Sequence, residues 1–170
     1  MEIRLEQLVV RLEQKDDYRE VENLTREAFW DVYRPGCSEH LVLHKLRNAK
    51  SFISDLDYVF VVDKKIIANI VYTKMFNEKG EMLNDVIAFG PISVHPEYQK
   101  RGIGKKIIEI SINRAKELGY KAVLITGNDK FYNPLGFEGA YKYGVTLPGM
   151  SVEDKAEFFM AMELEKGYLS

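Results

Sequence analysis

The sequence predicts an α/β (α+β) chain with a central mixed, mostly antiparallel sheet flanked by helices. Strand-like and helix-like segments alternate along it, and a strand–helix–strand step spans residues 87–126. That step brings the chain back in the same direction, so it predicts one parallel pair in an otherwise antiparallel sheet. The length of 170 residues predicts a single domain over residues 1–170, with its core at about residues 9–165.

The first third of the chain predicts one strand and two helices. Residues 9–12 are a short apolar run, and Asp16-Asp17 can cap a helix that ends at Pro35-Gly36. Ser38 can cap the next helix. The residues that define the two apolar faces are Val21, Leu24, Ala28 and Phe29 in the first helix, and Leu41, Val42 and Leu46 in the second.

The middle of the chain predicts three strands that follow one another through tight turns. Their ranges are 58–62, 66–75 and 82–94, and the polar turns between them are 63–65 and 77–80. The remaining elements are a helix over 102–118, a strand over 122–126, a short helix that starts at Asn128 or Asp129 and ends at Gly136, and a strand over 158–164.

Composition excludes several classes of protein. Lys plus Arg number 24 and Asp plus Glu 26, and the net charge of −2 argues against a nucleic-acid partner. Cys37 is the one cysteine, so no intramolecular disulfide can form and a cytoplasmic location is expected. No apolar run approaches the roughly 20 residues of a membrane span, and the N-terminus is charged where a signal peptide is apolar. We therefore expect no membrane partner.

The segment between the strand over 82–94 and the helix over 102–118 points to an anion site. Gly102 and Gly104 lie at the start of the helix, where backbone N–H groups lack intrahelical acceptors and the helix dipole is positive. Four cations fall within the eight residues 99–106, where an even spread would give about one. A phosphate is the most natural ligand.

Two familiar nucleotide motifs do not fit. A dinucleotide fingerprint needs a third glycine where Ile107 stands. Gly144 and Gly149 have the spacing of a P-loop, but Met150 stands where the lysine should be.

The motif Gln99-x-x-Gly102-x-Gly104 resembles the hallmark of the GNAT family, the GCN5-related N-acetyltransferases. Residues 91–99 look like the exit of that family's fourth strand, and Tyr132-x-x-x-Gly136-Phe137 looks like a second family segment. The ending Phe-Met-Ala-x-Glu-Leu over residues 159–164 is similar to one branch of the family. The resemblance covers residues 9–164 and implies the GNAT fold, in which parallel strands 4 and 5 splay apart.

The resemblance implies acetyl-CoA as co-substrate and no metal. The pyrophosphate would lie on the amides of residues 99–104, and the pantetheine arm would pair with residues 92–94 like an added strand. Gly90-Pro91 interrupts the strand and favours a bulge there. The Ile92 amide would hold the oxyanion. The residues expected to bind the cofactor are Ile92, Ser93, Val94, Gln99, Lys100, Arg101, Gly102, Ile103, Gly104, Lys105, Asn128, Phe131 and Tyr132.

By the same resemblance, Tyr132 is the general acid that protonates the leaving thiolate. A phenol with a pKa near ~10 donates uphill to a thiol near ~8.5, so a hydrogen bond that only stabilises the thiolate would serve nearly as well. The structural alternative for Tyr132 is a packing residue before the Gly-Phe turn. For Asn128 and Phe131 the alternatives are a helix cap and a core aromatic.

A general base is not assigned. Asp31, Glu39, Glu81 and Asp85 are candidates, none at a decisive spacing, and family members also use a water chain.

For three further features we favour a structural role over a functional one. His40 and His44 share a helix face, but two ligands are too few for zinc, so a solvated face is expected. Cys37 has no visible His–Asn/Asp context, and ordinary burial is expected. Phe29, Trp30 and Tyr33 could wall an acceptor pocket, yet their helical spacing favours core packing.

The predicted function is acetyl-CoA-dependent N-acetyl transfer to a primary amine, on a small molecule or a peptide, by direct attack in a ternary complex. The alternative is an acetyl-CoA-binding sensor without transferase activity. A longer acyl group and the acceptor's identity stay open. The loop over residues 141–158 could be a lid or a homodimer contact, and its acidic residues are expected to be a solvated surface.

Overall fold

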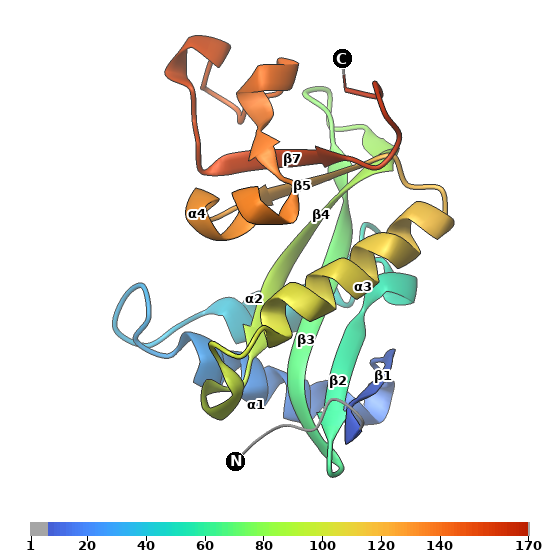
Figure 1. Cartoon of the computed structure of the whole chain (residues 1–170), viewed down its shortest axis with the longest axis vertical. Helices are drawn as coiled ribbons and strands as arrows, with labels where there is room; N and C mark the ends of the chain where they lie inside the picture. Colours follow the sequence, from blue (N-terminus) through green and yellow to red (C-terminus); the bar gives the residue numbers. More distant parts are fainter. Residues whose placement is uncertain (1–6, 170) are drawn as a thin grey trace. The chain divides into compact units, whose positions relative to one another are not determined.

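The computed structural model describes residues 7–169, which contain four α-helices and seven strands (Figure 1). The helices are α1 (Tyr18–Phe29), α2 (Glu39–Leu46), α3 (Ile103–Glu117) and α4 (Asp129–Tyr132). The strands are β1 (Val9–Leu12), β2 (Tyr58–Val62), β3 (Lys65–Phe76), β4 (Met82–Val94), β5 (Ala122–Thr126), β6 (Glu138–Gly139) and β7 (Phe159–Glu163).

The strands are hydrogen-bonded in the order β1-β2-β3-β4-β5-β7-β6. The pair β4–β5 is parallel, and the pairs β1–β2, β2–β3, β5–β7 and β6–β7 are antiparallel. This confirms the predicted mixed sheet with one parallel pair. The described chain forms two compact units, which are described separately below: one holds the chain up to Tyr72 with Gly90–Arg114, and the other holds Thr73–Phe89 and the chain from Ala115 onward.

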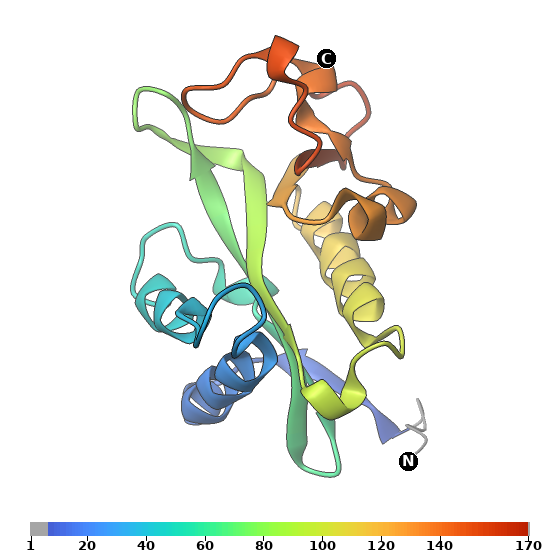
Figure 2. The ribbon, with the colours of Figure 1, turned by 90° about the vertical axis from the view of Figure 1, so that its left-hand side faces the viewer.

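In the first unit, α1 and α2 lie side by side on one face of β2 and β3, and α3 lies on the opposite face (Figure 2). The α1–α2 side has its own apolar cluster, made of Val21, Leu24, Leu43, Val59, Val61, Ile66 and Val71. The cluster confirms Val21 and Leu24 of the expected face of α1, whereas Ala28 and Phe29 are half-buried. The expected face of α2 is wrong for Leu41 and Val42, which are exposed. Its third residue, Leu46, does pack against the cluster, and Leu43 is the buried residue that was not expected.

On the α3 side of the first unit, a buried hydrogen bond joins strand to helix. Tyr72 Oη and Ser111 Oγ lie 2.8 Å apart, and Ser111 Oγ also donates to the Ile107 carbonyl at 2.7 Å. Ile103, Ile107 and Ile108 of α3 are buried, as the spacing predicts. The middle of the helix is thereby fixed on the sheet.

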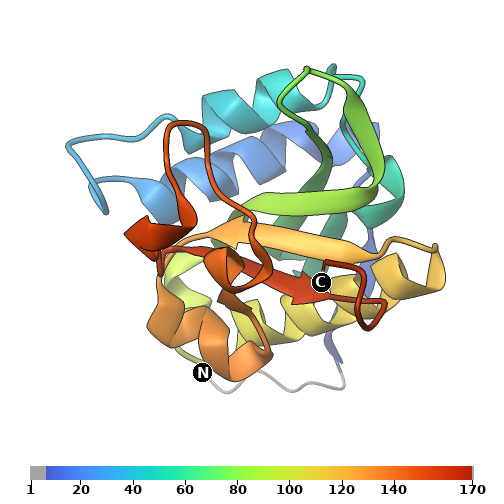
Figure 3. The ribbon, with the colours of Figure 1, turned by 90° about the horizontal axis from the view of Figure 1, so that it is seen from above.

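In the second unit, β5 lies beside β7 along its whole length, and α4 follows β5 (Figure 3). The parallel register of β4 and β5 runs from Val86↔Ala122 to Ala88↔Leu124. Two-residue β6 was not predicted, since so short a strand has no periodicity of its own.

Gly90 lies in the middle of β4 with φ 139, a conformation that favours glycine, and its bond to Pro91 is cis. The strand continues past this point to Val94. Over residues 7–169, no helix is long and apolar enough to cross a membrane.

Candidate functional site

His95 directs the chain out of the sheet at the end of β4. Its N–H donates to the Ile67 carbonyl at 2.8 Å, and its Nδ1 accepts from the Glu97 N–H at 3.2 Å. The Tyr98 N–H donates to the His95 carbonyl at 2.8 Å, which closes the short 3-10 helix Pro96–Tyr98. The start of the glycine-rich loop is therefore held to the first unit's sheet.

The hallmark glutamine fastens the loop to the strand. Gln99 Nε2 donates to the Val94 carbonyl at 2.9 Å. The backbone then passes through two left-handed residues, Lys100 with φ 62 and Gly102 with φ 79. Because a carbonyl has two lone pairs, Val94 O can still accept a second hydrogen bond.

Helix α3 begins directly after this turn. The Lys106 N–H donates to the Gly102 carbonyl at 3.1 Å, so the N–H groups of Ile103, Gly104 and Lys105 precede the first intrahelical bond. Lys100, Arg101 and Lys105 are exposed around them. This combination of helix start and cations suits a phosphate, as the sequence predicts.

Ser93 shows which way β4 faces at the expected pantetheine segment. Its side chain is buried, and Oγ donates to Thr25 Oγ1 of α1 at 3.0 Å. Thr25 Oγ1 in turn donates to the Val21 carbonyl at 2.9 Å. Since side chains alternate along a strand, Ile92 and Val94 face away from α1. Ser93 itself is fixed to α1, so only its backbone is placed for a cofactor.

Tyr132 lies in the second unit, at the end of α4, with 8% of its surface exposed. Its ring packs against Phe89 and Phe137 with centroids 5.9 Å apart in each case, and against Phe131 at 4.9 Å. The ring of Tyr132 is therefore packed among aromatic residues, as the structural alternative for this residue predicts. Asn128 caps α4 by accepting the Lys130 N–H at 3.0 Å, which confirms the cap alternative for that residue. Phe131 is 44% exposed, so the core alternative for it is wrong.

Gly127 supports Tyr132 and is not among the predicted site residues. A Cβ at this position would lie 2.7 Å from Tyr132 Cε2. The ring is held by aromatic neighbours and cannot easily give way. The available signal was a glycine between a buried strand and a helix cap, which indicates close approach as well as a turn.

The predicted cofactor residues fall into two groups. Ile92–Val94 and the loop from Gln99 to Lys105 belong to the first unit. Asn128, Phe131 and Tyr132 belong to the second.

Three of the four candidate bases have local structural tasks. Asp31 Oδ1 accepts from the Gly36 N–H at 2.5 Å, Glu39 Oε2 from Ser38 N–H at 3.1 Å, and Glu81 Oε2 from Asn77 Nδ2 at 3.1 Å. Each carboxylate closes a turn or a helix start. Asp85 lies in β4, where its carbonyl accepts the Lys121 N–H at 2.8 Å.

A carboxylate that sequence reasoning missed is Glu27. Its Oε2 lies 3.3 Å from His95 Nε2, and 60% of its side chain is exposed. Nothing in the spacing of Glu27 pointed to β4. Only the packing of α1 against β4 brings it to the strand's end.

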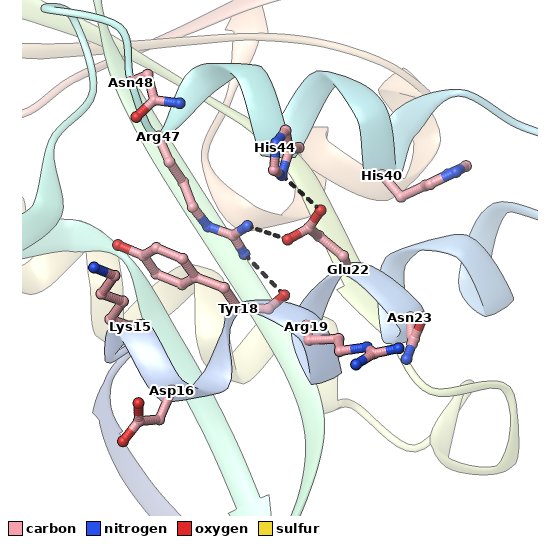
Figure 4. A pocket seen from close by; sticks show the side chains of 10 residues that line it. All are labelled: Lys15, Asp16, Tyr18, Arg19, Glu22, Asn23, His40, His44, Arg47 and Asn48. Carbon is pink, nitrogen blue, oxygen red and sulfur yellow. Dashed lines mark hydrogen bonds and ion pairs between the residues drawn. The ribbon is translucent and has the colours of Figure 1, made fainter.

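A pocket of about 500 Å³ lies between α1 and α2 (Figure 4). At the rim of the pocket, His44 Nδ1 lies 2.9 Å from Glu22 Oε1. The His44 side chain is 66% exposed, which confirms the prediction that it lies on a solvated face. His40 Nδ1 lies 3.5 Å from Cys37 Sγ. Among residues 7–169, no group of three or more His, Cys, Asp or Glu side chains could hold a metal ion.

The floor of this pocket is a buried ion cluster. Arg47 donates to Glu13 Oε1 at 3.0 Å and Oε2 at 2.9 Å, and to Glu22 Oε2 at 2.7 Å. Its guanidinium also lies 4.0 Å from the centroid of the Tyr18 ring. The side chains of Arg47 and Glu13 are 4% and 0% exposed, so the pairing compensates charges that water cannot reach.

Asp57 extends the cluster into the core. Burial, together with the hydrogen bond and charge of Glu13, raises the pKa of Asp57 to about 9. Asn69 Nδ2 donates to Asp57 Oδ1 at 2.9 Å. At neutral pH the Asp57 carboxyl therefore holds a proton.

Three further predictions have an outcome. Cys37 is half-buried, so the expected ordinary burial is only partly met. What burial there is raises the pKa of the Cys37 thiol, which argues against a nucleophile. Core packing is wrong for Trp30 and Tyr33, whose exposed fractions are 48% and 80%.

In the 141–158 loop, Glu157 accepts from Tyr141 Oη at 2.9 Å and Asp154 from the Ser151 N–H at 2.8 Å. These acidic residues thus close the loop on itself.

Comparisons with known proteins agree with the motif. Residues 55–139, half of the chain, match the family described as "Acetyltransferase (GNAT) domain". The chain is similar to "Uncharacterized N-acetyltransferase YjhQ" of Escherichia coli, at 32% identity over 75 residues, which are 44% of the chain and 41% of YjhQ. It is similar to "Uncharacterized N-acetyltransferase YhbS" of the same species, at 25% identity over 77% of the chain and 74% of YhbS.

Solved structures show the same fold. YhbS of Escherichia coli in complex with CoA aligns at a TM-score of 0.81 and 22% identity, over 96% of this chain and 85% of that one. A GNAT family acetyltransferase of Brucella melitensis in complex with acetyl-CoA aligns at 0.75 and 22% identity, over 92% and 87%. The chain belongs to the GNAT family of N-acetyltransferases.

Proposed function

We propose that the chain is a single acetyltransferase domain that transfers acetyl from acetyl-CoA to a primary amine. One observation carries the proposal: the turn at Gln99–Gly102 leads into the start of α3, where the N–H groups of residues 103–105 precede the first intrahelical bond among exposed cations, within a chain of the GNAT family. A diphosphate is the ligand that such a helix start accommodates best. The single cysteine supports a cytoplasmic location as part of the same proposal.

The cofactor's pyrophosphate would lie on the amides between Gln99 and Gly104. Lys100, Arg101 and Lys105 would neutralise its charge. Its pantetheine arm would take the place of β5 beside residues 92–94, because the β4–β5 register ends at Ala88↔Leu124.

The chemical step is direct attack in a ternary complex. The amine must be neutral, and its lone pair attacks the thioester carbonyl carbon to form the C–N bond. The oxygen then carries negative charge, which the Ile92 N–H would stabilise. The C–S bond breaks, Tyr132 would donate a proton to the thiolate, and the nitrogen loses its extra proton to water. The products are an N-acetyl amine and CoA thiol.

The aromatic surround of Tyr132 supports this role for it. Phe89 and Phe137 fix the ring, and Gly127 leaves room for it. A fixed, largely buried phenol loses little freedom when it donates a hydrogen bond.

Two measurements test the proposal. Calorimetry with acetyl-CoA should give a binding isotherm, and an assay of released thiol should report turnover across a panel of amines. Cofactor binding without turnover on any amine would indicate a sensor, whereas no binding at millimolar acetyl-CoA would refute the proposal entirely.

Tyr132→Phe tests the acid. Turnover should fall about a hundredfold, within the range of general acid catalysis, while acetyl-CoA affinity stays within twofold. Tyr168→Phe, which removes another tyrosine hydroxyl, should leave both unchanged. Undiminished turnover of Tyr132→Phe would remove Tyr132 from the mechanism.

A further inference from the structure

A second, smaller pocket of about 430 Å³ lies in the first unit, where α1 ends beside the exit of β4. It is lined by Arg26, Glu27, Trp30 and Pro96. Pro96 follows β4 by two residues and precedes Gln99 by three. The pocket therefore lies beside the strand and the loop that we assign to the cofactor.

Arg26 supplies a positive charge to this pocket in a fixed orientation. Its guanidinium lies 4.6 Å from the centroid of the Trp30 ring, and Trp30 is 48% exposed. Stacking on an indole leaves the planar fork of N–H donors available at its edge. Such a fork matches the two oxygens of a carboxylate.

Glu27 supplies a negative charge from the neighbouring position of the helix. His95 Nε2 lies 3.3 Å from Glu27 Oε2, and His95 Nδ1 is held by the Glu97 N–H. A carboxylate offers about four acceptor sites, so this contact leaves capacity for a ligand ammonium. His95 thus positions Glu27 and leaves acceptor sites of its carboxylate for a ligand.

The pocket is also at a defined distance from the proposed reaction centre. Three residues of strand separate Ile92 from His95, roughly 10 Å at the usual rise. Ser93 and His95 both face α1, through Thr25 and Glu27. A molecule held at Glu27 must therefore extend along β4 to bring a second group near Ile92.

We propose that this pocket binds the zwitterionic head group of a basic amino acid, whose distal amine is the acetyl acceptor. The α-carboxylate lies on Arg26 and the α-ammonium on Glu27, and the distal amine reaches the thioester. This inference rests on the proposed function and names its substrate class. The distal nitrogen gains the acetyl group, CoA leaves as the thiol, and the proton passes to water.

The test compares lysine with two molecules that each lack one charge of the head group. Cadaverine lacks the carboxylate, and 6-aminohexanoate lacks the α-ammonium. In the thiol-release assay kcat/KM for lysine should exceed both by about tenfold, through KM, as expected for one charged hydrogen bond at a half-exposed site. Diaminopropionate, with its shorter side chain, should be the poorest diamino acid.

Two variants assign the charges. Arg26→Gln should abolish the preference for lysine over cadaverine but keep that over 6-aminohexanoate. Glu27→Gln, which removes the negative charge and keeps the side-chain length, should abolish the preference over 6-aminohexanoate but keep that over cadaverine. Arg19→Gln on the same helix and Glu109→Gln on α3 are matched controls that should change neither ratio. Thermal melting of each variant confirms that the fold is kept.

Equal kcat/KM for all three compounds, or a preference that both variants retain, would overturn the head-group site. Turnover on other amines would in that case leave the proposed acetyl transfer intact. Absence of acetyl-CoA binding in calorimetry would instead refute the proposed function.

Discussion

Two clusters of charge in the first unit use similar side chains and differ in how their charges are compensated. Beneath the α1–α2 pocket, Arg47 and Glu13 are nearly inaccessible and bind each other through two hydrogen bonds. At the start of α3, Lys100 and Lys105 are exposed, and between them lie backbone N–H groups that precede the first intrahelical hydrogen bond. A compensated cluster stabilises the fold, whereas a cluster that a ligand must complete binds that ligand.

The larger of the two pockets therefore belongs to the structural cluster rather than to the loop that we assign to the cofactor. Glu22 is bound by both Arg47 and His44 (Figure 4). A ligand would have to replace interactions that the protein already makes.

The largest expected effect comes from breaking the compensated cluster. Arg47→Met leaves Glu13 buried without its counter-charge and should lower the free energy of unfolding by about 3–5 kcal/mol. Urea denaturation followed by circular dichroism measures this. Arg19→Met at the exposed rim of the same pocket should stay within about 0.5 kcal/mol of the wild type. Equal losses in the two variants would contradict the distinction between floor and rim.

A second prediction concerns the proton that the Asp57 carboxyl holds in the folded chain. The folded-state pKa of Asp57, about 9, lies above its unfolded value of 3.8, so the folded chain holds a proton that the unfolded chain releases. The stabilisation is complete below about pH 4 and is lost as the pH rises toward about 9. The free energy of unfolding should fall by about 1.4 kcal/mol per pH unit, which amounts to about 2–3 kcal/mol between about pH 6 and about pH 8.

Asp57→Asn removes the titrating carboxyl group and keeps the shape of the side chain. Its amide can donate to Glu13 and its oxygen can accept from Asn69, as Asp57 does now. Urea titrations at several pH values should therefore give a flatter profile than the wild type. An unchanged slope would show that the proton is held elsewhere in the cluster.

Gly127 illustrates a third situation, in which packing rather than charge supports the site. Gly127→Ala would place a methyl group 2.7 Å from Tyr132 Cε2. The displaced ring should cost about 1–3 kcal/mol of stability and lower turnover, with acetyl-CoA affinity kept. Wild-type turnover in Gly127→Ala would mean that Tyr132 tolerates displacement.

Local patterns predicted most of the fold. The strands at 82–94 and 122–126 matched residue for residue, because apolar runs between polar turns define buried strands. The proposed cofactor loop could be predicted from sequence because Gln99, Gly102 and Gly104 lie within one turn of chain.

The missed features all depend on contacts between distant segments. Glu27 meets His95 across 68 positions of sequence, and Arg47 meets Glu13 across 34. Both contacts follow from the packing of helices on the sheet. The face of α2 was misjudged for the same reason, since Leu43 is the one apolar residue of its middle turn that reaches the core.

The smallest expected effect tests the uncompensated cluster. Lys105→Gln removes one cation beside the proposed pyrophosphate and should weaken acetyl-CoA binding about fivefold at low salt, since one exposed charge contributes about 1 kcal/mol. The difference should shrink as salt is added, because mobile ions screen exposed charges. Lys116→Gln at the other end of α3 should bind normally, and stability should be the same in both. If Lys105→Gln lost stability but not affinity, Lys105 would be a compensated charge like Arg47, and the contrast between the two clusters would not hold.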